Sequence, residues 1–398
     1  MHAQANKLDQ LKSSLKAFVS PSLRFEIRQK KSQLKYFFAG LCFWKWQHIQ
    51  FVFNQSNPEE TSLAATSAMT IHYKGRPENV PMLKALRGVN AAVNAVKTVT
   101  TTASKSEIYV TEHPMRDSIR IPFALITIVK LGRPIEDIVA SYSKSLRRSI
   151  NAERTNYRYQ AINDITKIGK IETNMLKAYA TARHDIGAAQ LETGTVKKFA
   201  QKEHGRLDLL LQGDEEVGCH LGNPYTRQGK RYWHVNRLGY PNSVFSDYKR
   251  WGEVNSINLH LALEASIQNG YDYCDYGVSL AKPGHGLIEW KRRRRGFLAT
   301  HDNFSYFYMK LPKTGGAQFL WDTPVFGVEG GKPTLHLGIP EGKTDEELLA
   351  RYNEMGYAGL YKVYLDCVKP PSAQFIESIR ALYADQESQP LVISYVVG

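Results

Sequence analysis

The residues of this 398-residue chain that are best suited to chemistry lie between Gly270 and Phe297. An aromatic-rich run ending at Tyr276 predicts a strand, which would carry Asp275 to its C-terminal end. A loop rich in glycine follows, and Lys291 then precedes four consecutive arginines. Glycines let the main chain approach a ligand closely, and Lys and Arg suit a phosphate or a developing oxyanion. The segment therefore indicates either a ligand site beyond a strand end or a tight turn followed by a solvated basic face.

Hydrophobic periodicity and turn signals predict the elements that position this segment. We expect strands at 107–110, 119–130, 157–162, 206–212, 216–221, 231–238, 271–276, 296–300 and 305–311. Helices are expected at 135–150, 171–182, 195–203, 254–268 and 287–294, with a loop at 277–286 between the strand and the last of them. Gly213 and Asp214 form a strong turn signal, which predicts a hairpin between two of the strands.

Three regions are expected along the chain. Residues 1–133 form a degenerate N-terminal region, 134–312 the sharply patterned central domain, and 313–398 a small C-terminal appendage. Strands at 334–337, 359–365 and 391–396 alternate there with two helices, at 344–356 and 371–384. Thr344 and Glu347 form a capping box that opens the first of these helices. The order predicts a βαβαβ unit.

Composition narrows the class of protein. A 42% hydrophobic content argues against a wholly disordered chain, and 52 Lys and Arg against 38 Asp and Glu give a net charge of +14. This charge fits nucleic acid, an anionic membrane surface, a phosphate-bearing substrate or simple solubility. Four cysteines without a CxxC motif predict neither a zinc site nor a disulfide framework, and they fit a reducing compartment. No segment predicts a membrane span or a signal peptide, so we expect a cytoplasmic protein, with peripheral membrane contact left open.

Three groups of motifs in residues 134–312 together resemble a known family. The first is a basic helix that ends in Lys144-Ser145-Leu146-Arg147-Arg148, and the second is a hairpin with Gly218 and Gly222 that leads to a helix with Ser256 and Asn258. The third is Asp275-Tyr276-Gly277-x-Ser279, followed by Gly284-x-Gly286 and Trp290-Lys291. With the order of elements, these resemble the GNAT acyltransferase fold and its Fem-type (FemAB-like) aminoacyltransferase and acetyltransferase-like branch. The chain has Arg295-Gly296 where relatives commonly have Trp-Gly, and it lacks the usual acetyl-CoA loop signature at 236–241.

The resemblance implies an α/β (α+β) fold, with a mixed, largely antiparallel sheet flanked by helices and with two GNAT-like halves as one arrangement. It also implies acyl or aminoacyl transfer to an amine in cell-envelope or polysaccharide-linked metabolism. No covalent enzyme intermediate is needed, because the enzyme orients both substrates and stabilises the oxyanion. The co-substrate would be an anionic, phosphate-bearing donor, either an acyl thioester such as acyl-CoA or an aminoacyl-tRNA, and no metal is expected.

Two residues are candidates for catalysis under this resemblance. Lys291 would stabilise the oxyanion or bind a donor phosphate. Asp275 would accept a proton or orient the amine, with a turn cap as the alternative. The candidates for substrate binding are Tyr276, Ser279, His285, Arg147, Arg148 and Asn258, although a solvated helix face is an alternative for the two arginines and a merely polar role for the histidine.

Other residues are weaker candidates. Cys219 and His220 are adjacent in a predicted strand and would point to opposite faces, so they make a poor catalytic dyad. His204, His234 and His260 show no metal-ligand spacing. The alternative functions are a non-catalytic nucleic-acid-binding protein that uses the 291–295 run and the basic N-terminus, and a small-molecule N-acetyltransferase that uses acetyl-CoA.

Overall fold

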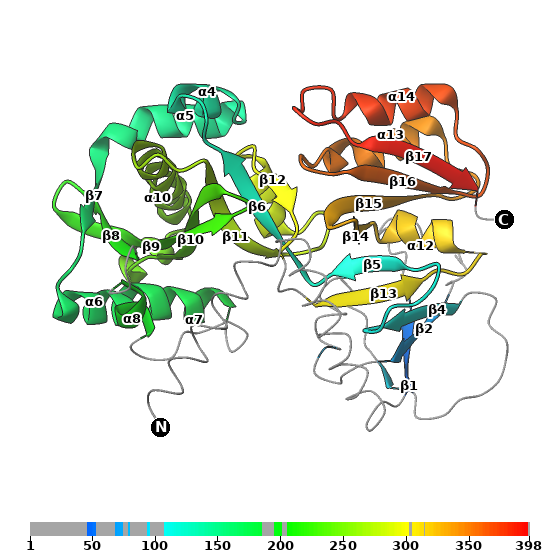
Figure 1. The fold of residues 1–398 in the computed structure, drawn as a ribbon, viewed down its shortest axis with the longest axis horizontal. Coiled ribbons are helices and arrows are strands. Elements are labelled where there is room, and N and C mark those ends of the chain that lie inside the picture. Colours follow the sequence, from blue (N-terminus) through cyan, green and yellow to red (C-terminus); the bar gives the residue numbers. More distant parts are fainter. Residues whose placement is uncertain are drawn as a thin grey trace, which may run out of the picture.

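The computed structural model describes residues 46–52, 68–74, 79, 94–95, 107–184, 195–200, 205–301, 305–313 and 315–396. In these ranges the strands form three sheets, of seven, six and four strands (Figure 1). Most of the expected N-terminal region lies outside the described residues, so a GNAT-like half there stays a prediction. No described helix is long and apolar enough to cross a membrane.

The seven-stranded sheet contains the segment singled out by the sequence. Its order is β12 (Phe297–Ala299), β6 (Ala124–Lys130), β11 (Tyr273–Leu280), β10 (Lys230–Gly239), β9 (Glu215–Arg227), β8 (Arg206–Gln212) and β7 (Tyr157–Ala161). Neighbouring strands are antiparallel, except that β10 and β11 are parallel. This confirms the expected fold class, a mixed and largely antiparallel sheet flanked by helices.

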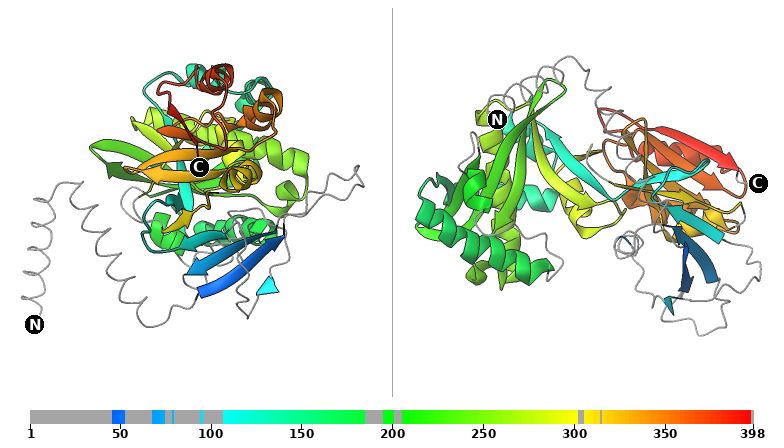
Figure 2. Two further views of the ribbon diagram at one scale, coloured as in Figure 1. Left: turned by 90° about the vertical axis from the view of Figure 1, so that its right-hand side faces the viewer. Right: turned by 60° about the horizontal axis from the view of Figure 1, so that its bottom comes forward.

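Helices cover both faces of this sheet (Figures 1 and 2). On one face lie α4 (Ile135–Ala140), α5 (Lys144–Glu153), α9 (Asn242–Phe245) and α10 (Tyr248–Gln268), with the short η2 (Arg154–Asn156) after α5. On the other face lie α6 (Ile165–Ile171), η3 (Glu172–Lys177), α7 (Ala178–His184) and α8 (Thr195–Ala200). Each face has its own hydrophobic core. Ile257 of α10 packs with Trp233 and Cys274 in one core, and Leu176 of η3 packs with Leu209 in the other.

The six-stranded sheet contains only the first part of the strand expected at 119–130, which is divided between two sheets. Its order is β3 (Asn94–Ala95), β1 (Trp46–Val52), β2 (Ala68–Lys74), β4 (Glu107–Thr111), β13 (Tyr306–Lys310) and β5 (Ile119–Pro122). The strand expected at 119–130 breaks at Phe123, whose N–H bonds to the carbonyl of Ser305 (3.0 Å) and whose ring packs on Phe307. Its first part, β5, joins this sheet, and its second part, β6, joins the seven-stranded sheet.

The C-terminal residues form a four-stranded sheet and three helices. After α12 (Gly316–Asp322), the strands β14 (Val325–Glu329), β15 (Lys332–Ile339), β16 (Lys362–Cys367) and β17 (Leu391–Val396) pair in this order, and the last three are parallel. Helices α13 (Asp345–Tyr352), with η5 (Asn353–Met355) after it, and α14 (Ala373–Ala381) connect them, and the capping box of Thr344 and Glu347 is confirmed. The sequence did not predict α12 or β14. Leu335 and Phe319 share one core with Ile108 and Phe307, so this unit packs against the six-stranded sheet.

Two further expectations were wrong in their bounds. The helix expected at 135–150 is two helices, because Ser141 ends α4 by bonding to the carbonyl of Ile138 (2.6 Å) and Ser143 precedes α5. The loop expected from Gly277 begins later, because β11 continues to Leu280. The strand bends there through an irregularity in its register with β6, and α11 (Gly286–Arg292) follows the shorter loop.

Candidate functional site

The parallel strands β10 and β11 separate at the residue that the sequence singled out. They pair only over Tyr232–His234 of β10 and Tyr273–Asp275 of β11. Both strands continue, to Gly239 and Leu280, but no described residue beyond Asp275 joins them. The register of β10 with β11 therefore ends at His234 and Asp275, at the C-terminal end of their paired segments.

Asp275 lies at this point of separation, with 2% of its surface exposed. Its Oδ2 lies 3.0 Å from Nδ1 of His234 and accepts a hydrogen bond from the Tyr225 hydroxyl (3.1 Å), while Oδ1 accepts one from the Gly277 N–H (2.8 Å). Burial alone would raise the pKa of Asp275, but the hydrogen bond and charge of His234, with the other two donors, lower it. The carboxylate is thus kept ionised and oriented.

His234 is the partner that sequence reasoning missed. Since an ionised carboxylate only accepts hydrogen bonds, Asp275 places the ring proton on Nδ1 and leaves the lone pair on Nε2. Nε2 makes no hydrogen bond within the described part of the chain, and the side chain is 22% exposed. An imidazole held by a buried carboxylate in this way is suited to accept a proton as a general base.

Lys291 lies on α11 beneath the same bend of β11. Its ammonium group donates to the carbonyls of Gly277 (2.7 Å) and Val278 (3.1 Å), and the residue is 2% exposed. Burial lowers the pKa of Lys291 to about 7, although the negative charge of Asp275 acts in the opposite direction. Lys291 and Asp275 thus bond to the same residue of the bend, Gly277. The role of Lys291 toward an oxyanion or a phosphate stays a prediction.

Three predicted binding residues surround this bend. Tyr276 is buried on the α10 face of the sheet beside Tyr142, and burial raises its pKa well above the ordinary value. Ser279 is 3% exposed, and its hydroxyl has no hydrogen-bond partner among the described residues. His285 is half-buried just before α11, where burial and the charges of Lys282 and Lys291 lower its pKa.

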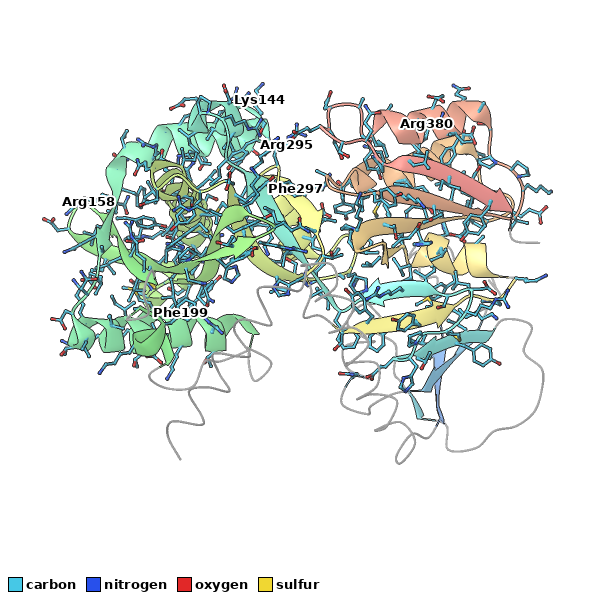
Figure 3. The ribbon with its side chains drawn as sticks, in the orientation of Figure 1. Lys144, Arg158, Phe199, Arg295, Phe297 and Arg380 are labelled. Atoms are coloured by element: carbon cyan, nitrogen blue, oxygen red, sulfur yellow. The ribbon has the colours of Figure 1, made fainter. Side chains whose placement is uncertain are left out.

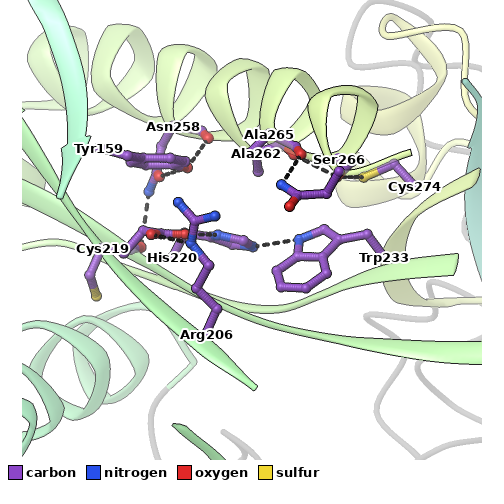
Figure 4. A network of polar contacts seen from close by, with 12 residues as sticks. Tyr159, Arg206, Cys219, His220, Trp233, Asn258, Ala262, Ala265, Ser266 and Cys274 are labelled. Atoms are coloured by element: carbon purple, nitrogen blue, oxygen red, sulfur yellow. Dashed lines mark hydrogen bonds and ion pairs between the residues drawn. The ribbon is translucent and has the colours of Figure 1, made fainter. Parts of the chain in front are cut away.

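The other three predicted binding residues lie away from this cluster. Arg147 donates to the carbonyl of Ala140 (2.7 Å), and the neighbouring Arg148 is exposed on α5. Asn258 is fully buried in a polar network that joins α10 to the sheet (Figure 4). Its Oδ1 accepts from the Tyr159 hydroxyl (2.6 Å) and its Nδ2 donates to the carbonyl of Cys219 (3.0 Å). None of these contacts reaches Asp275, so their binding roles stay predictions.

The basic run 291–295 does not form one basic surface. Lys291 and Arg294 are buried, and Arg294 lies over the Trp290 ring (3.8 Å) and donates to the Ser256 hydroxyl (2.9 Å). Arg295 lies beside α5, where it donates to the carbonyl of Ser141 (2.6 Å; Figure 3). Two of the five side chains are therefore buried, whereas Arg293 and Arg295 are exposed, so the nucleic-acid-binding alternative stays a prediction.

A tyrosine from the C-terminal unit holds the loop before α11. The Tyr357 hydroxyl accepts a hydrogen bond from the Gly284 N–H (2.8 Å) and donates one to Glu289 (2.6 Å). Tyr357 is 1% exposed and lies after η5, far from the loop in sequence. The C-terminal unit thus fixes the start of the helix that carries Lys291, a connection that no local sequence pattern shows.

A row of aromatic rings borders Asp275 on the same face as His234. Tyr232 stacks on Tyr225 and on Tyr273, each with ring centroids 4.8 Å apart, and Phe297 meets Tyr273 edge-on. Tyr273 therefore packs against rings of the neighbouring strands. In the described ranges no three His, Cys, Asp or Glu side chains could hold a metal ion, and Cys219, Cys274 and Cys367 are free and buried.

Comparisons with known proteins add structural similarity only. No family profile matches the sequence, and no curated protein matches it. Among solved structures, the chain is similar to FemX, with 9% identity and a TM-score of 0.36 over 67% of this chain and 88% of the other. It is similar to L-PGS from Bacillus licheniformis, with 9% identity and a TM-score of 0.33 over 61% and 77%, and to a GCN5-related N-acetyltransferase from Sphaerobacter thermophilus, with 10% identity and a TM-score of 0.27 over 66% and 76%. Similarity at this level assigns no activity to the chain.

Proposed function

We propose that this protein transfers an acyl or aminoacyl group from an activated donor to an amine, with His234 and Asp275 at its catalytic centre. The observation that supports this proposal is the hydrogen-bonded His234–Asp275 pair at the point where β10 and β11 separate. The pair supplies a base, and we place the donor beside it, where the pairing of β10 with β11 ends.

The reaction needs one proton transfer in each direction. The amine attacks the carbonyl carbon of the donor, and Nε2 of His234 takes the proton that the nitrogen loses. The carboxylate of Asp275 stabilises the imidazolium that forms. As the tetrahedral intermediate collapses, the bond to the thiolate or to the tRNA oxygen breaks, and the imidazolium returns the proton to this leaving group.

The diverging strands are suited to orient an extended donor. Edge strands carry main-chain N–H and C=O groups that can pair with another extended chain. A donor with amide groups would bind along such an edge, with its carbonyl near His234. The bend at Gly277, held by Lys291, fixes the position of Asp275 relative to that edge. Positioning of this kind lowers the barrier without any covalent intermediate.

The donor is an acyl thioester or an aminoacyl-tRNA. Both carry phosphate, and a net charge of +14 favours either of them. A reducing compartment such as the cytoplasm fits the free cysteines. We place the acceptor amine in cell-envelope or polysaccharide-linked metabolism on the family resemblance of the sequence.

The proposal is tested by a panel of donors with the natural protein and with His234→Gln. Acetyl-CoA, long-chain acyl-CoA, UDP-sugar peptides and tRNA are compared by thermal shift, and each donor that binds is then assayed for transfer to amines. We expect one donor to raise the melting temperature of both proteins, and transfer to fall at least ~10²-fold in the variant. His285→Gln, which replaces the other histidine near the bend, serves as the comparison.

Two outcomes would contradict the proposal. Transfer that survives His234→Gln but not His285→Gln would make His285 the base. Binding of tRNA alone, without turnover and only at low salt, would favour the nucleic-acid-binding alternative. Stabilisation by acetyl-CoA with transfer to small amines would instead select a small-molecule N-acetyltransferase within the proposed class.

A further inference from the structure

A cavity of about 460 Å³ lies between the six-stranded sheet and the C-terminal sheet. Strands β5 and β13 supply one side of its lining, and β14, β15, β16 and β17 supply the other. The cavity shares no lining residue with the cluster around Asp275. Its size falls in the range of small-molecule sites, ~300–1,000 Å³.

A buried acid and a buried histidine line this cavity without a hydrogen bond between them. Asp366 is 2% exposed and His336 is 8% exposed. Oδ2 of Asp366 lies 3.7 Å from Nδ1 of His336, and neither atom has a hydrogen-bond partner within the described residues. Polar atoms buried without a partner cost free energy, so this arrangement indicates that a group beyond the described residues completes it.

The neighbours of His336 indicate which kind of group is missing. Nε2 of His336 lies 3.5 Å from the Thr334 hydroxyl, whose oxygen can accept its proton. A Cβ on Gly327 would meet that hydroxyl at 2.5 Å and Nε2 at 3.0 Å, so the glycine of β14 allows this contact. With the ring proton on Nε2, Nδ1 is an acceptor. Nδ1 and Oδ2 of Asp366 are then two adjacent acceptors that need a donor.

The charge and shape of the lining favour a cationic donor. Three carboxylates line the cavity, but Glu329 pairs with Lys362 (2.5 Å) and Asp117 with Arg116 (3.6 Å), which leaves Asp366 without a lysine or arginine partner among the described residues. Arg120, the one arginine or lysine in the lining, lies over the Tyr306 ring (3.7 Å). The rings of Tyr364 and Tyr395 also line it, and Tyr364 stacks on His336 with ring centroids 4.7 Å apart. Carboxylates and aromatic faces together attract an ammonium group.

We propose that this cavity binds a small molecule through a primary ammonium group, which donates to Oδ2 of Asp366 and Nδ1 of His336. An ammonium has three N–H donors, so it satisfies both acceptors at once. An alcohol supplies one donor and no charge, and a carboxylate is repelled by Asp366. The site is separate from the His234–Asp275 cluster. Whether or not it binds an ammonium group, the proposed transfer reaction is therefore tested independently.

The first test uses 1,5-diaminopentane as the probe, with pentan-1-ol and glutarate as the neutral and anionic comparisons. Binding to the natural protein is measured by calorimetry, alongside Asp366→Asn and a matched control, Asp322→Asn, on α12 outside the cavity. We expect the diamine alone to bind, Asp366→Asn to weaken it at least tenfold, and Asp322→Asn to leave it unchanged. Binding of the alcohol as tightly as the diamine, or of the diamine equally to all three proteins, would overturn the proposal.

A second measurement needs no variant and therefore does not depend on how Asp366→Asn folds. The carboxyl carbon of Asp366 and the ring nitrogens of His336 are followed by NMR in the natural protein during the diamine titration. We expect both residues to shift with the same saturation curve. Saturable binding that leaves both signals in place, or the absence of saturable binding, would show that the cavity is not an ammonium site.

Discussion

Nδ1 of His234 lies 3.0 Å from Oδ2 of Asp275, and these two residues form the last pair that joins β10 to β11. The same contact therefore orients an imidazole and marks where the pairing of the two strands ends. Gly277, two residues on, donates to the other oxygen of Asp275 (2.8 Å), so the bend of β11 also fixes the carboxylate. Strand geometry and the chemistry of the site depend on each other here.

Replacing Asp275 with Asn is expected to slow transfer by about 10²–10⁴-fold, because the uncharged amide can turn its NH2 group toward Nδ1 of His234 and cannot stabilise the imidazolium. Tyr225→Phe, which removes only a neutral donor to the same carboxylate, is expected to cost about tenfold or less. The measurement is kcat/KM with the donor that the panel identifies. Tyr248→Phe, at a 77% exposed position, is the matched control and should leave the rate unchanged. Wild-type transfer by Asp275→Asn would remove Asp275 from the mechanism.

Because the pKa of Lys291 is lowered in the folded protein, we expect the free energy of unfolding to rise with pH above 7. Its folded-state pKa is about 7, below the ordinary 10.5, so the unfolded chain binds more protons between these values. The free energy of unfolding therefore rises with pH in this window, by at most about 1.4 kcal/mol per pH unit. Chemical denaturation between pH 7 and about 7.5, below the ordinary cysteine pKa of ~8.5 and the tyrosine pKa of ~10, measures the slope.

The control for this prediction is a pair of lysine variants. Lys291→Met should lose the rise in stability between the two pH values, although it is less stable at both because the Gly277 and Val278 carbonyls lose their donor. Lys310→Met, at an exposed position at the end of β13, should keep the natural slope. Equal slopes in all three proteins would show that the ammonium stays charged in its buried site.

Local signals in the sequence predicted the parts of the fold that depend on neighbouring residues. The hairpin turn at Gly213 and the capping box of Thr344 are set by a few consecutive side chains, and both are present. The break at Phe123 was missed because β-branched residues continue from β5 into β6, and the two strands are distinguished only by the different sheets that they join. A periodicity argument reads such a run as one strand.

The site was predicted in part for the same reason. Asp275 lies next to glycines that mark a special turn, so a local pattern pointed to it. His234 lies 41 residues earlier, and only the parallel pairing of β10 with β11 brings the two together. The strand–helix–strand order around α10 was a usable signal, since strands joined by one helix commonly lie parallel and adjacent. Metal-ligand spacing, the pattern considered for the histidines, gave no indication of a role for His234.

Asn258 is expected to matter for stability more than for transfer. Asn258→Ala would leave the Cys219 carbonyl without its Nδ2 donor, while the Tyr159 hydroxyl would keep the main-chain carbonyl of residue 258 as its acceptor (Figure 4). We expect a loss of about 1–3 kcal/mol in the free energy of unfolding, the cost of one buried group left unpaired. Chemical denaturation measures it, with Asn156→Ala at an exposed position as the control. A specific loss of donor affinity in folded Asn258→Ala would instead support its predicted binding role.

Tyr357→Phe is expected to loosen the loop before α11 without removing any group from the His234–Asp275 pair. The lost hydroxyl links the Gly284 N–H to Glu289, so the variant should be less stable by about 1–3 kcal/mol. Hydrogen exchange of residues 284–289 should become faster, and transfer should slow because Lys291 on the same helix no longer holds the bend of β11 as firmly. Tyr361→Phe, at a 40% exposed position, is the control. Unchanged exchange in this loop would mean that α11 is held by its own packing and that the C-terminal unit does not position the site.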